Sequence, residues 1–239
     1  MSTKARAGQR HPTARRTGPP LFPIAVTVVV VLLLAVLVIS AIGGDDTSTP
    51  SADGGDDDVA QTRAVTVAGT PLLQYGSQPI DEDDAVGVEA PTISGEDFDG
   101  DPVAIEADGR PKAVAFLAHW CGHCRAEVPR LAAWLDDHDV PDAIDLVLVP
   151  TSTSSAQPNY PPSAWLADAG LGDVPTLVDD DRSAAHVAFG GGGFPYWVLL
   201  DADHRVVARM SGEFPDDPDV YTTMFDALAA GDPITDPRT

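Results

Sequence analysis

The two cysteines of this chain, Cys121 and Cys124, belong to the run Trp120-Cys121-Gly122-His123-Cys124, and the 239 residues contain no other cysteine. One intramolecular disulfide is therefore possible, and it would close too short a loop to stabilise a fold by restricting the unfolded chain. The pair is better suited to chemistry, because a thiolate is a nucleophile and a metal ligand.

The residues around the pair predict where it sits. Ala113 to Leu117 is an apolar run with the length of a buried strand. Apolar residues then recur on one face of a predicted helix, namely Val128, Leu131, Ala132 and Leu135. The cysteines therefore open a helix, where unpaired N–H groups and the helix dipole stabilise negative charge. An ordinary cysteine, with a pKa of about 8.5, is mostly thiol at neutral pH, so this location favours the reactive form.

This arrangement predicts thiol–disulfide exchange. Cys124 lies one helical turn beyond Cys121 and can reach it. One sulfur would therefore attack the client and the other would resolve the mixed disulfide. We expect Cys121 to attack and Cys124 to resolve; the opposite assignment is the alternative. His123 can donate to the Cys121 thiolate, which would make the disulfide a stronger oxidant; the alternative is an exposed spacer. We expect Trp120 to pack beside the thiols or to fill the core, and His119 to lie on the surface.

Further apolar runs predict the rest of the domain. Ile144 to Val149 indicates a second strand, and Tyr196 to Leu200 a third, which turns at Asp201–His204 into Arg205–Met210. The last helix carries one apolar face: Tyr221, Met224, Phe225 and Leu228. The first two strands should be parallel and the last two antiparallel. The pattern predicts an α/β domain with one mixed sheet flanked by helices on both faces.

The N-terminal part predicts a membrane anchor. Five basic residues precede residues 21–42, which carry no charge, and aspartates follow. A helix of that length spans about 33 Å, enough to cross a bilayer with its N-terminus in the cytoplasm. We expect a basic tail at 1–20, a transmembrane signal anchor at 21–42, a disordered acidic stalk at 43–63, the folded domain at 64–233 and a tail at 234–239.

A cleaved signal peptide is the alternative reading of the N-terminus, because residues 41–43 offer a small-x-small cleavage site. Either reading exports the domain to a compartment where disulfides persist. The formal net charge of −23 argues against nucleic acid and anionic lipid as partners.

The chain resembles the thioredoxin superfamily, and within it the membrane-anchored, extracytoplasmic thiol–disulfide oxidoreductases of the TlpA/ResA type. The resemblance covers about 89–230 and rests on three blocks: "EAPTISGEDFDG", "AVAFLAHWCGHCRAEVP" and "GGFPYWVLLDADHRVV". It implies a thioredoxin-like fold and a redox-active disulfide between Cys121 and Cys124, with no other cofactor and no metal.

The resemblance also implies supporting residues. A cis proline faces the cysteines in the family, and Pro195 matches it, with Phe194 supplying backbone groups for an extended client peptide. Val174-Pro175 is a second candidate for the cis proline, but the residues after it give only a weak strand signal, so we prefer Pro195. The dipeptide Gly122-His123 matches that of protein disulfide isomerases.

Glu127 is the remaining residue that the resemblance singles out. Thioredoxin has a buried aspartate six residues before its first cysteine, and this chain has Ala115 there. A glutamate at the position of Glu127 is typical of the subfamily, and it would handle the proton of the resolving thiol. The alternative is a helix-surface glutamate paired with Arg130 or solvent.

The expected function is a membrane-tethered protein thiol–disulfide oxidoreductase, with its domain outside the cytoplasm. Expected partners are exported proteins with thiols or disulfides, apocytochrome c and a membrane electron donor among them. The His123 argument favours oxidation or isomerisation, and the resemblance favours reduction. Two alternatives remain open: a Cu(I) site of both thiolates with His119 or His123, and a thiol peroxidase, because "EAPTISG" is similar to peroxiredoxins. Two cysteines are too few for a structural zinc site.

Overall fold

The computed structural model describes residues 59–238. The predicted basic tail at 1–20, the membrane span at 21–42 and most of the stalk at 43–63 lie outside these residues and stay predictions. Within 59–238, no helix combines the length and the apolar character that crossing a membrane requires.

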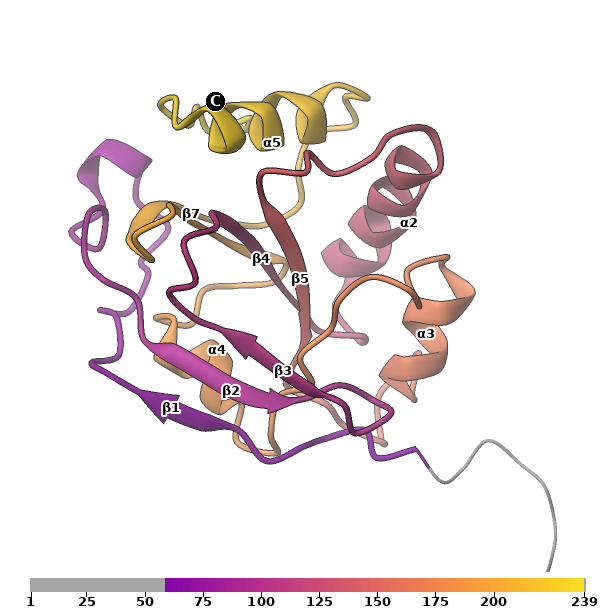
Figure 1. Ribbon diagram of the computed structural model, residues 1–239. Coiled ribbons are helices and arrows are strands. Elements are labelled where there is room, and N and C mark those ends of the chain that lie inside the picture. Colours follow the sequence, from indigo (N-terminus) through magenta and orange to yellow (C-terminus); the bar gives the residue numbers. More distant parts are fainter. Residues whose placement is uncertain (1–58, 239) are drawn as a thin grey trace, which may run out of the picture. The chain divides into compact units, whose positions relative to one another are not determined.

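The described residues form strands and helices that pack into one folded region (Figure 1). In chain order the elements are β1 (Thr66–Ala68), the 3-10 helix η1 (Ile80–Glu82), β2 (Thr92–Glu96), β3 (Pro102–Ile105), β4 (Lys112–Leu117), α2 (Gly122–Asp137), β5 (Asp145–Pro150), α3 (Pro162–Asp168), α4 (Ala184–Ala188), β6 (Tyr196–Leu200), β7 (Val206–Ser211) and α5 (Val220–Ala230).

The strands form two sheets, of order β1-β2-β3 and β5-β4-β6-β7. The parallel pairing of β4 with β5 and the antiparallel hairpin of β6 and β7 confirm the predicted pairings. The predicted mixed sheet is the four-stranded one, but the sequence did not indicate a second sheet, in which β1, β2 and β3 pair with one another in antiparallel register. Strand β2 gave little signal in the sequence, since Ile93 is its one buried residue and Gly95 interrupts it.

Strand β4 is fully buried because both faces of its sheet are covered. Its odd-numbered residues, Ala113, Ala115 and Leu117, belong to the core cluster that α2 and α5 complete. Its even-numbered apolar residues, Val114 and Phe116, belong to the cluster with α4 and the N-terminal sheet. The two clusters fix β4 between the helices (Figure 1), and the chain passes from the carboxyl end of β4 through residues 118–121 into α2.

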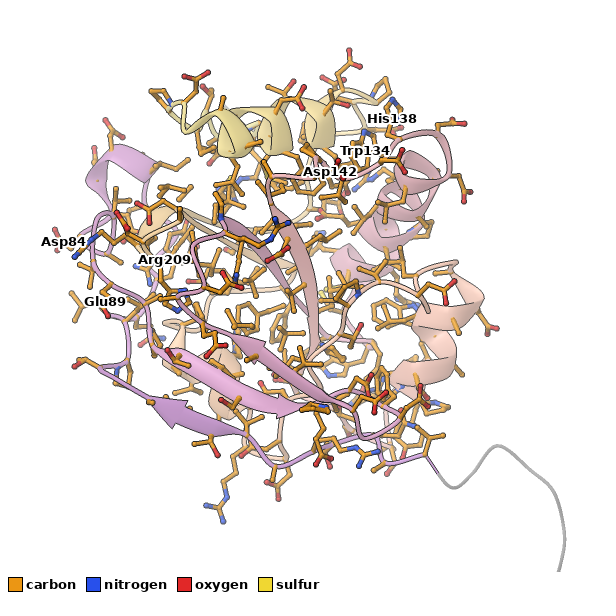
Figure 2. The ribbon with its side chains drawn as sticks, in the orientation of Figure 1. Asp84, Glu89, Trp134, His138, Asp142 and Arg209 are labelled. Atoms are coloured by element: carbon orange, nitrogen blue, oxygen red, sulfur yellow. The ribbon has the colours of Figure 1, made fainter. Side chains whose placement is uncertain are left out.

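Helix α2 follows the predicted amphipathic pattern. Val128, Leu131 and Ala132 are buried, and the helix ends at Asp137, before Pro141. Trp134 adds to the buried face: its ring packs on Phe225 of α5 and stacks on His138 with centroids 5.0 Å apart. Figure 2 shows Trp134 and His138 at the end of α2 that lies beside α5. The opposite end of α2 carries the cysteines.

A buried ion pair fastens the N-terminal arm to the central sheet. Arg209 on β7 (Figure 2) donates to both carboxylate oxygens of Asp83, at 2.7 and 2.5 Å, and both side chains are almost fully buried. The same guanidinium donates to the Leu73 carbonyl at 2.7 Å. These three hydrogen bonds tie residues 73–83 to β7, the strand beside β6, and β6 begins directly after Pro195.

Candidate active site

Cys121 is the N-terminal cap of α2. Its backbone is extended, with φ −72° and ψ 129°, and its carbonyl accepts from the Arg125 N–H at 3.1 Å. The Cys121 side chain is partly exposed, and Sγ lies 3.5 Å from the Phe194 carbonyl oxygen. The sulfur therefore stands where the free N–H groups of the helix favour a negative charge and where a client can reach it.

Cys124 is fully buried one turn further along α2. Burial raises the pKa of the Cys124 thiol far above its ordinary value, and the neighbouring Cys121 sulfur and the charge of Glu127 raise it further. Both cysteines are free thiols, so the structure describes the dithiol form, and the Cys121–Cys124 disulfide stays a prediction. The unequal burial assigns different tasks to the two sulfurs.

Glu127 lies in the interior, so the alternative of a helix-surface glutamate was wrong. Its side chain is 1% exposed, Oε1 accepts from the Trp197 indole at 2.6 Å, and Oε2 accepts from the Phe214 N–H at 2.7 Å. Burial raises the pKa of Glu127 to about 7, against the lowering effect of those two hydrogen bonds and of Arg130. A carboxyl poised near neutral pH, three residues beyond the buried thiol, can take up a proton that Cys124 releases.

Pro195 occupies the position that the resemblance implies. The Phe194–Pro195 peptide bond is cis, and the Phe194 carbonyl faces the Cys121 sulfur. The Trp120 ring meets the Phe194 ring edge-on, with centroids 5.9 Å apart, and its indole donates to the Ser152 carbonyl at 2.8 Å. The Trp120 ring on one side and the cis bond to Pro195 on the other therefore hold the Phe194 backbone beside the Cys121 sulfur.

Among the described residues, the Val174–Pro175 bond is not cis, in agreement with the preference for Pro195. A second cis bond, Tyr160–Pro161, was not indicated by the sequence.

His119 is buried near the Tyr160–Pro161 bond, so its predicted surface position was wrong. Nδ1 of His119 lies 2.7 Å from the Pro158 carbonyl, and Nε2 accepts from the Ser154 N–H. Burial lowers the pKa of His119, and the neutral ring fastens this loop beside the motif.

His123 is exposed, and its contact differs from the predicted one. Nδ1 donates to Oε2 of Glu213 across 2.8 Å and not to the Cys121 thiolate, and the exposure of the ring fits the alternative of an exposed spacer. Glu213 lies 90 residues further along the chain, in the loop after β7. No periodicity in the sequence could have paired these residues. Gly122, the other residue of the dipeptide, opens α2.

His186 is a further site residue that the sequence did not reveal. It lies buried on α4, where Nε2 donates to the Gly192 carbonyl at 3.1 Å, and its ring packs on Phe194 with centroids 4.7 Å apart. Burial lowers the pKa of His186, so the neutral ring supports the loop that leads to the cis proline. The sequence indicated a loop at 190–193 but no residue that would hold it.

Comparisons with known proteins agree with this geometry. No family model matches the chain. The thiol:disulfide interchange protein HelX of Rhodobacter capsulatus is 29% identical over 148 residues, which cover 61% of this chain and 77% of HelX. A structure from Chlorobium tepidum, provisionally assigned as the thiol:disulfide interchange protein DsbE, is 20% identical with a TM-score of 0.50, and the match covers 60% of this chain and 97% of that one. The fold is thioredoxin-like.

The structure of a hypothetical protein of Sinorhizobium meliloti also matches, with a TM-score of 0.51 and 18% identity over 70% of this chain and 92% of that one. At such identities the two structures establish the fold alone.

Among the described residues, no group of three or more histidines, cysteines and carboxylates is placed to hold a metal ion. Both ring nitrogens of His119 are engaged and His123 pairs with Glu213, so neither supports the Cu(I) alternative.

Proposed function

We propose that this chain is a membrane-tethered thiol–disulfide oxidoreductase whose thioredoxin-like domain acts outside the cytoplasm on exported proteins. The enzyme class follows from the dithiol at the start of α2, the thioredoxin-like fold and the similarity to a thiol:disulfide interchange protein. The observation that carries the proposal is the unequal burial of the two sulfurs: Cys121 is partly exposed beside Phe194, and Cys124 is sealed beneath it.

The exchange proceeds in two steps. The Cys121 thiolate attacks one sulfur of a client disulfide, a mixed disulfide forms, and the other client sulfur leaves as a thiolate. Cys124 then gives its proton to Glu127 and attacks Cys121 Sγ. The new Cys121–Cys124 bond releases the second client sulfur as a thiolate, so the client gains two electrons and the enzyme loses two. A membrane electron donor of thiol chemistry would return them.

Extended client segments would lie along the backbone beside the cis proline. Pro195 has no N–H, so the neighbouring groups of Phe194 stay available to pair with a client strand next to its cysteine. We propose no metal and no cofactor beyond the redox-active disulfide itself.

Reduction is the direction that we propose. The argument for an oxidase required His123 to stabilise the Cys121 thiolate, and its ring donates to Glu213 instead. The resemblance to the TlpA/ResA type supports the same direction, with apocytochrome c among the clients and cytochrome c maturation as the setting. The tether rests on the uncharged residues 21–42 between a basic and an acidic segment.

Trapping clients tests this function. In full-length Cys124→Ser the second step cannot occur, so mixed disulfides on Cys121 should accumulate in membranes and release exported proteins when a reductant is added. The matched control, Cys121→Ser/Cys124→Ser, should trap none. Equal recovery of clients by both variants would refute the proposal. The direction is tested with the wild-type protein: a preformed Cys121–Cys124 disulfide that oxidises client thiols, with a dithiol form that does not reduce client disulfides, would reverse the proposed direction.

A further inference from the structure

Three consecutive residues after β7 contact three different parts of the site. The Gly212 N–H donates to the Pro195 carbonyl at 2.8 Å, next to the cis bond. The Glu213 carboxylate accepts from His123 between the cysteines. The Phe214 N–H donates to Glu127 Oε2 at 2.7 Å. This segment, 212–214, therefore joins the client-facing loop, the dipeptide and the buried acid, although none of its residues belongs to α2.

The Glu213 carboxylate is held from two positions on α2. Oε2 lies 2.8 Å from Nδ1 of His123, and Oε1 lies 3.8 Å from Nη2 of Arg130, about two turns further along the helix. The side chain is 36% exposed, so the ion pair itself adds little to stability. The ion pair instead fixes the position of the His123 ring. While Nδ1 of His123 donates its proton to Glu213, that proton is not available to the Cys121 sulfur.

The segment also governs the surroundings of Glu127. The Phe214 ring stacks on Trp197 with centroids 5.5 Å apart, and both residues donate to the Glu127 carboxylate. The groups that face Glu127 are Cys124 and Arg130 of α2, Tyr221 of α5, and Glu213. The negative charge of Glu213 raises the pKa of Glu127, whereas Arg130 lowers it. Glu213 therefore opposes Arg130 and helps Glu127 to hold a proton.

We propose that Glu213 is a positioning residue for disulfide exchange, which holds the His123 imidazole off the Cys121 sulfur and fixes the Glu127 carboxyl through the adjoining Phe214 N–H. The inference rests on the proposed oxidoreductase function and explains why a Gly-His dipeptide accompanies a reductant. A released imidazole would be free to stabilise the Cys121 thiolate and so would make the disulfide more oxidising.

Redox equilibria test the first part. Full-length protein in detergent is equilibrated with glutathione buffers of graded ratio, and the dithiol fraction is read from maleimide labelling. Glu213→Ala should shift the equilibrium toward the dithiol by about threefold to tenfold. A tenfold change corresponds to about 30 mV. His123→Ala should cancel the shift in the double variant. Asp216→Ala, which removes an exposed carboxylate from the same loop, should leave the equilibrium unchanged.

The pH dependence of resolution tests the second part. Glu213→Gln keeps an oxygen that accepts from His123 but loses the charge, so its redox equilibrium should match the wild type. The pH midpoint for release of glutathione from a Cys121 mixed disulfide should move down, because the charge that raised the pKa of Glu127 is gone.

Three outcomes would overturn the inference: no shift in Glu213→Ala, a shift that persists without His123, or an unchanged pH midpoint in Glu213→Gln. A wild-type chain that forms no Cys121–Cys124 disulfide at any glutathione ratio would instead overturn the proposed function, and this inference with it.

Discussion

The stability of the reduced domain should depend on pH through Glu127. Burial raises the pKa of this carboxyl from an ordinary value of 4.5 to about 7. In the unfolded chain the group ionises near pH 4.5, whereas in the folded domain it keeps its proton up to about pH 7. Between these values the folded state binds more protons, so the free energy of unfolding falls as pH rises. At about 1.4 kcal/mol per pKa unit, the ionisation of Glu127 lowers the free energy of unfolding by about 3 kcal/mol over this pH range.

The variant Glu127→Gln cannot ionise and isolates this contribution. Urea unfolding of both reduced proteins between pH 4.5 and 7.5 gives the free energy of unfolding at each pH. The wild-type value minus the variant value should fall by about 3 kcal/mol across the window and then level off. The amide places an N–H against the Trp197 or Phe214 donor, and the resulting cost is the same at every pH.

Asp136→Asn is the matched control, because it removes an exposed carboxylate from the same helix. A difference between wild type and Glu127→Gln that stays flat from pH 5 to 7.5 would refute the reasoning. It would mean that the carboxyl is already ionised in the folded domain at pH 5, and Glu127 would then be a poor acceptor for the proton of Cys124.

Two further predictions concern the framework that carries the cis-proline loop. Asp83→Ala leaves the buried Arg209 guanidinium without its carboxylate, and urea unfolding should show a loss of about 3–5 kcal/mol; a loss below about 1 kcal/mol would contradict the role given to the pair. Gly190→Ala adds a Cβ against Arg209 and the Leu73 carbonyl at a φ of +90°, so it should cost at least about 2 kcal/mol, and an unchanged thermal midpoint would contradict this.

The elements that carry the reactive residues could be predicted from the sequence because their signals are local. The apolar runs at 113–117, 144–149 and 196–200 became β4, β5 and β6. The helical spacing of Val128, Leu131 and Ala132 predicted the buried face of α2. The cis bond before Pro195 was expected from the resemblance, since a strand and a hairpin follow it.

The contacts that tune the site could not be predicted, because they join distant residues. His123 meets Glu213 across 90 positions, and Glu127 meets Phe214 across 87. Neither partner lies in a periodic pattern, and a single glutamate in a polar loop looks like any solvated charge. His119 was wrongly placed on the surface because the loop that covers it, 152–160, is polar and follows no helical or strand period.

The central claim is that the two sulfurs occupy unequal positions, with Cys121 open to clients and Cys124 sealed beneath it. Brief treatment of the reduced protein with iodoacetamide at pH 7, followed by mass mapping of the labelled peptides, tests this directly. The structure predicts a carbamidomethyl group on Cys121 alone, with Cys124 labelled only after urea is added. Equal labelling of both cysteines in the folded domain, or earlier labelling of Cys124, would contradict the account.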